Sequence, residues 1–117
     1  MSAHAERVFP EECVGALLSD GQVRPLKNTA VDRRTTFCIS AAEYLGLERD
    51  GVGVTGFYHS HPDGPAVPSV ADARHATAHF CTLIIPVHQG IAATPRAFRF
   101  DDDHFTEIEV TLEGAAP

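Results

Sequence analysis

The sequence predicts a single α/β domain in which helices flank a mixed β-sheet. Three observations lead to this prediction. The chain has 117 residues, which is close to the commonest size of one domain. Strand-like segments alternate along it with shorter segments rich in helix formers. Residues 80–87 form a nearly continuous apolar run, which is typical of a strand buried on both faces of a sheet. We therefore expect residues 1–117 to fold as one domain.

The first part of the chain indicates one helix followed by two strands. Residues 2–9 have the character of the last turns of a helix that ends before Pro10. A buried strand is expected over residues 12–19, and Asp20-Gly21 after it is a hairpin turn signal. The partner strand should span residues 23–31.

A strand, a helix and the central strand are expected next. The short strand should lie at residues 37–39, after a polar loop. Ser40 is the predicted N-cap of a helix over residues 41–45, with Glu43 completing a capping box. Residues 52–58 are rich in β-branched and aromatic side chains, which predicts the central strand of the sheet.

The last part of the chain predicts a helix, a buried strand and a hairpin. Good helix formers occupy residues 71–76, and the apolar run at 80–87 follows. Residues 97–100 and 105–110 alternate in polarity, as in a hairpin with one face in water. The aspartates of the turn at 101–103 lack the spaced ligands and distal glutamate of an EF-hand, so we expect a solvated turn and no calcium site.

Composition excludes several classes of function. The formal net charge of −7 argues against nucleic acid or an anionic membrane as the partner. No apolar run approaches membrane-spanning length, and the first residues lack the pattern of a signal peptide. The three cysteines are widely spaced, and each has apolar neighbours. We interpret them as reduced core residues of a cytoplasmic protein.

Two histidines follow the central strand. His59 and His61 are two residues apart, so on an extended strand both side chains point to the same face. Turn-forming residues come next, and Asp72 then lies at the start of the following helix. Two imidazoles and a carboxylate form a three-ligand zinc set, and such a set leaves the fourth position open, as in catalytic zinc sites.

The same residues have a simpler interpretation. Ser69 and Asp72 fit a capping box, with Ser69 as N-cap and Asp72 at the third helical position. A His-x-His pair alone often arises by chance. The joint pattern is much longer, however, because Ser-x-x-Asp follows His-x-His after seven residues. This joint pattern resembles the signature of the JAMM (MPN-plus) zinc metallopeptidases.

The resemblance extends to the N-terminal part of the chain. The stretch Pro10-Glu11-Glu12-Cys13-Val14-Gly15-Ala16-Leu17-Leu18 is similar to the family's Pro-x-Glu-Cys-x-Gly-Leu-Leu-like segment. Glu12 falls on the position of the family's catalytic glutamate, although a charged residue at a strand entrance would also explain it. Asn28-Thr29-Ala30 matches the ending of the family's second strand. The resemblance implies the layered JAMM/MPN α/β architecture, whose layering is similar to that of cytidine deaminases.

The resemblance also implies a mechanism. One Zn²⁺ per chain would be bound by His59, His61 and Asp72, and the pKa of its water would fall to about 7. Glu12 would act as general base and then as general acid toward the leaving amine. The Ser69 hydroxyl would donate to the oxyanion. The residue types alone support a zinc hydrolase that acts on a carbonyl.

The step to peptide bonds rests on the resemblance alone. It implies a deubiquitinase-like isopeptidase that cleaves after the C-terminal Gly-Gly of a β-grasp ubiquitin-like or sulfur-carrier protein. Such a tail can bind as an added strand at a sheet edge. The resemblance leaves open which group the enzyme removes: a lysine-linked target, a C-terminal extension or a transferred cysteine. Relatives usually have a longer N-terminal helix, so we expect either a thinner core or cover by the second subunit of a homodimer.

Three other functions would use parts of the same pattern. A zinc deaminase needs His-x-Glu and Pro-Cys-x-x-Cys, and neither motif occurs here. A non-catalytic MPN scaffold that only binds a partner has usually lost ligands, whereas all five site residues are present. The third is an enzyme whose intact site stays inactive, because of the short N-terminus, until a partner or a dimer completes it.

The other histidines have no motif partner, and we expect them at the surface or half buried: His4, His75, His79, His88 and His104. The spacing of His75 and His79 would suit a metal on a helix, but Ala76 stands where the zincin motif requires glutamate.

Overall fold

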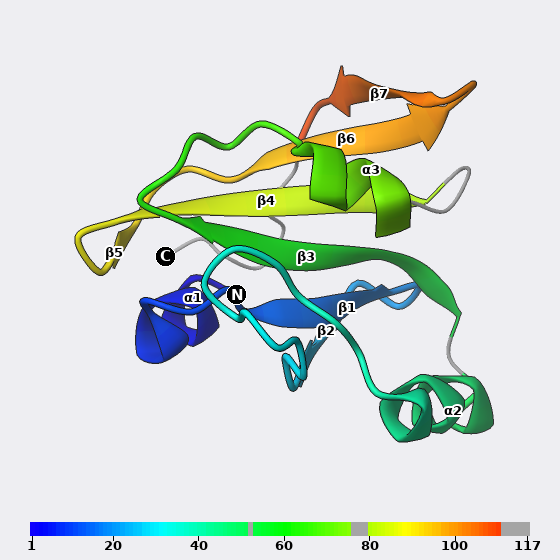
Figure 1. Ribbon diagram of the computed structural model, residues 1–117. Helices are drawn as coiled ribbons and strands as arrows, with labels where there is room; N and C mark the ends of the chain where they lie inside the picture. Colours follow the sequence, from blue (N-terminus) through cyan, green and yellow to red (C-terminus); the bar gives the residue numbers. More distant parts are fainter. Residues whose placement is uncertain (52, 76–79, 111–117) are drawn as a thin grey trace.

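The computed structural model describes residues 1–51, 53–75 and 80–110, and within them it forms one mixed sheet of seven strands. The strands are β1 (Val14–Leu18), β2 (Val23–Leu26), β3 (Val54–Pro62), β4 (Cys81–His88), β5 (Ile91–Ala92), β6 (Arg96–Asp101) and β7 (His104–Ile108). Their order is β2-β1-β3-β4-β6-β7, and β5 pairs with β4 (Figure 1). β3 and β4 are parallel, and the other pairs are antiparallel, which confirms the predicted mixed sheet.

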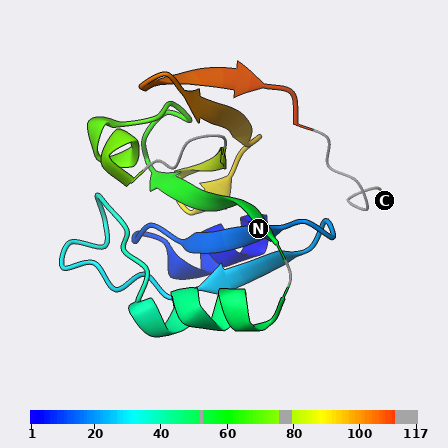
Figure 2. The ribbon, with the colours of Figure 1, turned by 90° about the vertical axis from the view of Figure 1, so that its right-hand side faces the viewer.

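Different helices cover the two faces of the sheet. The helices are α1 (Ser2–Val8), α2 (Ala41–Arg49) and α3 (Val70–His75). α1 packs Ala5 into the cluster that contains Tyr58 and Ile85. α2 packs Leu47 with Val14 on the opposite face. α3 connects β3 to β4 and crosses in front of them in Figure 1. Figure 2 shows α3 and the segment before α2 projecting toward the same side of the molecule.

The contact between α1 and the sheet includes a buried polar pair. The Nδ1 atom of His4 lies 2.8 Å from the Tyr58 hydroxyl. The Tyr58 ring occupies the space above Gly15, its partner residue on β1. A Cβ atom on Gly15 would lie 2.1 Å from two ring carbons of Tyr58, so only glycine fits there. His4 is buried, which corrects the expectation of a surface or half-buried residue.

The second strand is shorter than predicted. β2 ends at Leu26, whereas the sequence suggested a strand over residues 23–31. The side-chain oxygen of Asn28 accepts hydrogen bonds from the amides of Ala30 and Cys38. A side chain that bonds nearby backbone groups in this way competes with a strand ladder. For the same reason residues 37–39 are irregular, and the strand predicted there is wrong.

α2 begins where predicted but differs at its cap. The amide of Glu43 donates to the Ser40 hydroxyl at 3.2 Å, as expected for an N-cap. The Glu43 carboxylate, however, accepts from the amide of Lys27 at 2.9 Å in place of the expected bond to Ser40. This contact ties the helix to the end of β2. The helix continues to Arg49.

In the described part of the chain no helix is long and apolar enough to cross a membrane.

The C-terminal hairpin is confirmed. β6 and β7 pair from Ala97 with Ile108 to Asp101 with His104. Asp102 and Asp103 form the turn with φ angles of 51° and 63°. Two successive residues with positive φ are the mark of a type I′ hairpin turn. The short strand β5 was not predicted.

The three cysteines are free, but they are not all core residues. Cys13 is buried and Cys81 is half buried, whereas Cys38 is exposed. Cys38 belongs to the irregular segment before α2, so the prediction of three core thiols is wrong for this residue.

Candidate active site

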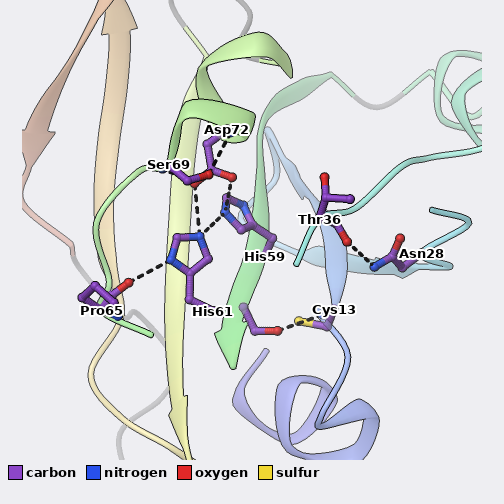
Figure 3. Close-up of polar contacts among 9 residues, drawn as sticks. Cys13, Asn28, Thr36, His59, His61, Pro65, Ser69 and Asp72 are labelled. Carbon is purple, nitrogen blue, oxygen red and sulfur yellow. Dashed lines mark hydrogen bonds and ion pairs between the residues drawn. The ribbon is translucent and has the colours of Figure 1, made fainter. Parts of the chain in front are cut away.

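The two histidines of the motif lie side by side on β3. His59 is buried, and the His61 side chain is 12% exposed. Their Nε2 atoms are 3.1 Å apart, so both rings point to one place above the sheet (Figure 3). The period of two along a strand accounts for their common face, as the sequence predicted.

Asp72 lies in the first turn of α3 and completes a group of three with His59 and His61. Its Oδ1 atom lies 3.1 Å from Nε2 of His59, and its Oδ2 atom lies 3.1 Å from Nε2 of His61. Ser69 holds this carboxylate in place (Figure 3). The Ser69 amide donates to Oδ2 at 2.8 Å, and the Asp72 amide donates to the Ser69 hydroxyl at 3.1 Å. Ser69 and Asp72 therefore form a capping box that also faces the histidines.

Strand pairing brings Glu12 to the same place. β1 and β3 are antiparallel, and Val14 pairs with His59. Continuing this register by two residues places Glu12 opposite His61, on the face that carries both imidazoles. Ligand atoms of Glu12, His59 and His61 all lie within 4.8 Å of one another. Glu12 is buried, and its Oε1 atom has no hydrogen-bond partner among the described residues.

Two neighbours of the histidines were not predicted. Nδ1 of His61 lies 2.8 Å from the carbonyl oxygen of Pro65, so in the neutral ring this nitrogen carries the hydrogen and Nε2 keeps its lone pair. The ring of Phe37 lies 4.8 Å from the ring of His59. A backbone carbonyl leaves no signal in a sequence, and Phe37 comes from a segment interpreted as a strand. Both contacts depend on loop conformation.

Burial and the two carboxylates set the charge states of the site. Burial lowers the pKa of His59, although Asp72 opposes the shift. Burial would also lower the pKa of His61, but bonds to Asp72 and to the Pro65 carbonyl outweigh it and raise this pKa. For Asp72, burial is outweighed by the two histidines, which hold its pKa well below the usual range. Burial raises the pKa of Glu12 to about 8, against the influence of His61.

The residues present fit a zinc ion. In tetrahedral zinc sites the bonds to nitrogen and oxygen are about 2.0–2.2 Å long, so neighbouring ligand atoms lie roughly 3.3–3.6 Å apart. The three 3.1 Å separations among His59, His61 and Asp72 are close to that spacing. The hydrogen bond from His61 to Pro65 is the outer contact typical of a metal-binding imidazole. The Nε2 lone pair of neutral His61 and the Asp72 carboxylate converge with Nε2 of His59, and a cation stabilises such a group of donor atoms.

A largely apolar cavity of about 180 Å³ opens beside the group. His59 and Asp72 form one end of it. The remaining walls come from the segment before α2, from α2 and from the starts of β3 and β4: Phe37, Cys38, Ile39, Tyr44, Phe57, Phe80, Cys81 and Thr82. An extended apolar or small-residue segment of a substrate could therefore lie next to His59 and Asp72.

One family model matches most of this chain. It is described as prokaryotic homologues of the JAB domain and matches residues 1–101. The "Desampylase" of Haloferax volcanii is 29% identical over 114 residues, covering 89% of this chain and 80% of the relative. A "Probable TtuB-protein conjugate cleaving protease" of Thermus thermophilus is 36% identical over 81 residues, covering 63% of this chain and 55% of that protein.

A third relative has a different description. "Tail tip assembly protein K" of Escherichia phage N15 is 32% identical over 89 residues, covering 74% of this chain. The chain spans only 35% of the length of the phage protein, just as it spans about half of the Thermus protein.

Two solved structures share the fold. The solution structure of a protein of Desulfitobacterium hafniense superposes with a TM-score of 0.80 at 30% identity. The match covers 95% of this chain and 84% of the other. The solution structure of a protein of Salinibacter ruber superposes with a TM-score of 0.63 at 28% identity. The match covers 99% of this chain and 87% of the other.

Proposed function

This chain belongs to the family of prokaryotic JAB-domain homologues, and we propose that it is a zinc-dependent isopeptidase. It would hydrolyse the bond after the C-terminal Gly-Gly of a ubiquitin-like or sulfur-carrier protein. The observation that carries the proposal is the convergence of His59, His61 and Asp72 opposite a buried glutamate with an unpaired oxygen. The names of two relatives, a desampylase and a probable conjugate-cleaving protease, support the substrate class.

The proposed metal ligands are His59, His61 and Asp72. Zinc, when bound, supplies Lewis acidity that polarises a carbonyl and lowers the pKa of water. The protein prepares the donor atoms for it: Pro65 orients the ring of His61, and Ser69 orients the carboxylate of Asp72. Ligands fixed in this way lose little conformational freedom on binding a cation.

Glu12 is the proposed proton carrier. Its Oε1 atom is buried and has no hydrogen-bond partner in the described part of the chain, so this oxygen is available to take a proton from the attacking water. The same group can then deliver the proton to the leaving amine. A pKa near 8, set by burial, favours protonated Glu12. A cation beside it favours the ionised form that accepts a proton, so metal binding and the basic form of Glu12 would be linked.

Ser69 is the proposed oxyanion donor. Its hydroxyl oxygen accepts a hydrogen bond from the amide of Asp72, and its own hydrogen is free to point elsewhere. A donor at this position can stabilise the negative oxygen that forms when water attacks a carbonyl. Ser69 is exposed, so its hydroxyl is accessible to a substrate.

The apolar cavity is the proposed site for the substrate tail. A Gly-Gly segment has no side chains, so it can pass close to His59 where a larger residue would collide. A lysine-linked target, a C-terminal extension and a transferred cysteine each stay open as the group released.

Metal analysis together with a cleavage assay tests this proposal. We expect elemental analysis to find about one zinc per chain, and a fusion joined through Gly-Gly to be cut after the second glycine. Chelation should stop cleavage, and zinc should restore it. A protein that holds zinc but cuts no such fusion, alone or with candidate partners, would instead be a binding scaffold.

A further inference from the structure

The sheet register brings Glu12 opposite His61, but a second segment also holds the backbone of Glu12. β1 begins at Val14, and the backbone of Glu12 makes its hydrogen bonds to the segment between β2 and α2. The Glu12 amide donates to the carbonyl oxygen of Arg33 at 2.6 Å. The Glu12 carbonyl oxygen accepts from the side-chain Nδ2 of Asn28 at 2.9 Å. The conformation of this segment therefore contributes, together with the register of β1 on β3, to the position of the Glu12 carboxylate.

Asn28 also organises the segment itself. Its Nδ2 atom donates to the carbonyl oxygen of Thr36 at 3.0 Å (Figure 3). Its Oδ1 atom accepts from the amides of Ala30 and Cys38 at 3.0 and 3.1 Å. A carboxamide has two hydrogens to donate and one oxygen with two lone pairs. Asn28 uses all four, and it is only partly accessible to solvent, so water competes poorly for these bonds.

The same segment reaches the other side of the site. It carries Phe37, whose ring lies 4.8 Å from the ring of His59. Phe37 follows directly after Thr36, the residue whose carbonyl oxygen Asn28 binds. One side chain thus connects the backbone of the glutamate to the segment that covers a histidine.

We infer that Asn28 is a positioning residue that fixes Glu12 against His59 and His61, an inference that rests on the proposed role of Glu12 as proton carrier. No other side chain of similar size supplies the same contacts. Aspartate keeps the two acceptor positions toward Ala30 and Cys38 but has no hydrogen for the carbonyl oxygens of Glu12 and Thr36. Asn28→Asp therefore removes the bonds to Glu12 and Thr36 while it keeps those to residues 30 and 38.

Kinetics of Asn28→Asp test the inference. We expect kcat to fall between about ten-fold and a hundred-fold, since a displacement of about 1 Å in a reacting group has such an effect. Zinc content should remain that of the wild type, and KM should change little. Thr29→Val is the matched control, because it removes the bond from the Thr29 hydroxyl to the Cys38 carbonyl in the same segment without touching Glu12. An unchanged kcat in Asn28→Asp, or an equal loss in Thr29→Val, overturns the inference.

A double-mutant cycle separates positioning from general damage. If Asn28 acts through Glu12, Asn28→Asp should have little further effect in a Glu12→Gln background. Equal losses in both backgrounds contradict the inference.

Hydrogen exchange gives a readout that needs neither activity nor a variant. The amides of Ala30 and Cys38 donate to Asn28, whereas the Glu12 amide donates to the carbonyl oxygen of Arg33 in the same segment. In the wild type the three amides should show similar protection, because Asn28 binds the Glu12 carbonyl oxygen and so joins Glu12 to this segment as one opening unit. Clearly different protection of Glu12 overturns the inference. If the wild type cuts no Gly-Gly fusion, the proposed function fails, while this measurement still decides whether Asn28 holds Glu12.

Discussion

Ser69 and Asp72 each accept a hydrogen bond from the other's backbone amide, and the carboxylate that closes this pair also lies 3.1 Å from both histidines. Helix capping and metal binding are therefore compatible functions of one residue pair. The two oxygens of Asp72 make this possible, because Oδ2 accepts from Ser69 and both oxygens face an imidazole.

The observed helix cap of Ser69 and its proposed role as oxyanion donor can be separated by substitution. Ser69→Ala should cost about 1 kcal/mol of folding free energy through loss of the cap. If the hydroxyl stabilises the oxyanion, kcat should also fall by roughly 10²-fold or more. Ser69→Asn and Ser69→Asp keep the cap, and Ser69→Asp adds a negative charge near the developing oxyanion. We expect Ser69→Asp to fold, bind zinc and be almost inactive. An active Ser69→Asp enzyme would reduce Ser69 to a helix cap.

Removal of either histidine should abolish zinc binding, with different effects on stability. We expect His59→Ala and His61→Ala to lose zinc, as measured by elemental analysis. The buried His59 packs against Phe37, so its truncation should lower the free energy of unfolding of the metal-free protein by roughly 2–4 kcal/mol. His61→Ala should cost less, because this side chain is partly exposed. His88→Ala, at an exposed position of β4, is the control and should keep zinc. Full zinc occupancy in a variant lacking both ligands would exclude this site.

The same substitution at Glu12 and at Glu11 tests which of the two neighbouring glutamates carries the proton. Glu12→Gln should retain zinc and lower kcat by roughly 10²–10⁴, because the amide cannot accept a proton. Glu11→Gln should keep most activity, since the Glu11 carboxylate is exposed and pairs with Arg33 at 3.1 Å. Wild-type turnover in Glu12→Gln would place the proton carrier elsewhere.

The buried Glu12 should make the metal-free protein less stable at alkaline pH. Its pKa is raised from 4.5 to about 8 in the folded chain, so folding favours the protonated form. The stability that this contributes is complete below pH 4.5, falls as the pH rises toward 8, and is absent above that value. Between these limits the chelated wild type should lose on the order of a few kcal/mol relative to Glu12→Gln, at about 1.4 kcal/mol for each pH unit. Urea titrations of both proteins across this range measure it, and parallel pH profiles would contradict it.

Two glycines should respond to alanine in opposite directions. Gly15→Ala places a methyl group 2.1 Å from carbons of the Tyr58 ring and should destabilise the fold by about 1–3 kcal/mol or more. Gly46 lies within α2 with no atom within 4 Å of an added Cβ. Gly46→Ala should therefore stabilise the protein by roughly 0.5–1 kcal/mol. Thermal denaturation compares the two, and equal shifts would show that Tyr58 can move aside.

The sequence determined those features that depend on neighbouring residues. A period of two placed His59 and His61 on one face, and the apolar run of residues 80–87 predicted the buried strand β4. The three-residue spacing of Ser69 and Asp72 predicted their capping box. In each case the interacting groups are close in the chain, so the local backbone geometry fixes their relation.

Only the tertiary structure decided the features that join distant segments. Glu12 reaches the histidines because Val14 pairs with His59, and a strand register is a choice among many that local periodicity does not specify. β2 ends at Leu26 because the side chain of Asn28 binds backbone groups of residues 12, 30, 36 and 38, which the pattern of residues 23–31 does not reveal. The sequence shows which groups can form hydrogen bonds, whereas their partners are decided when the chain folds and every buried polar group competes for the nearest one.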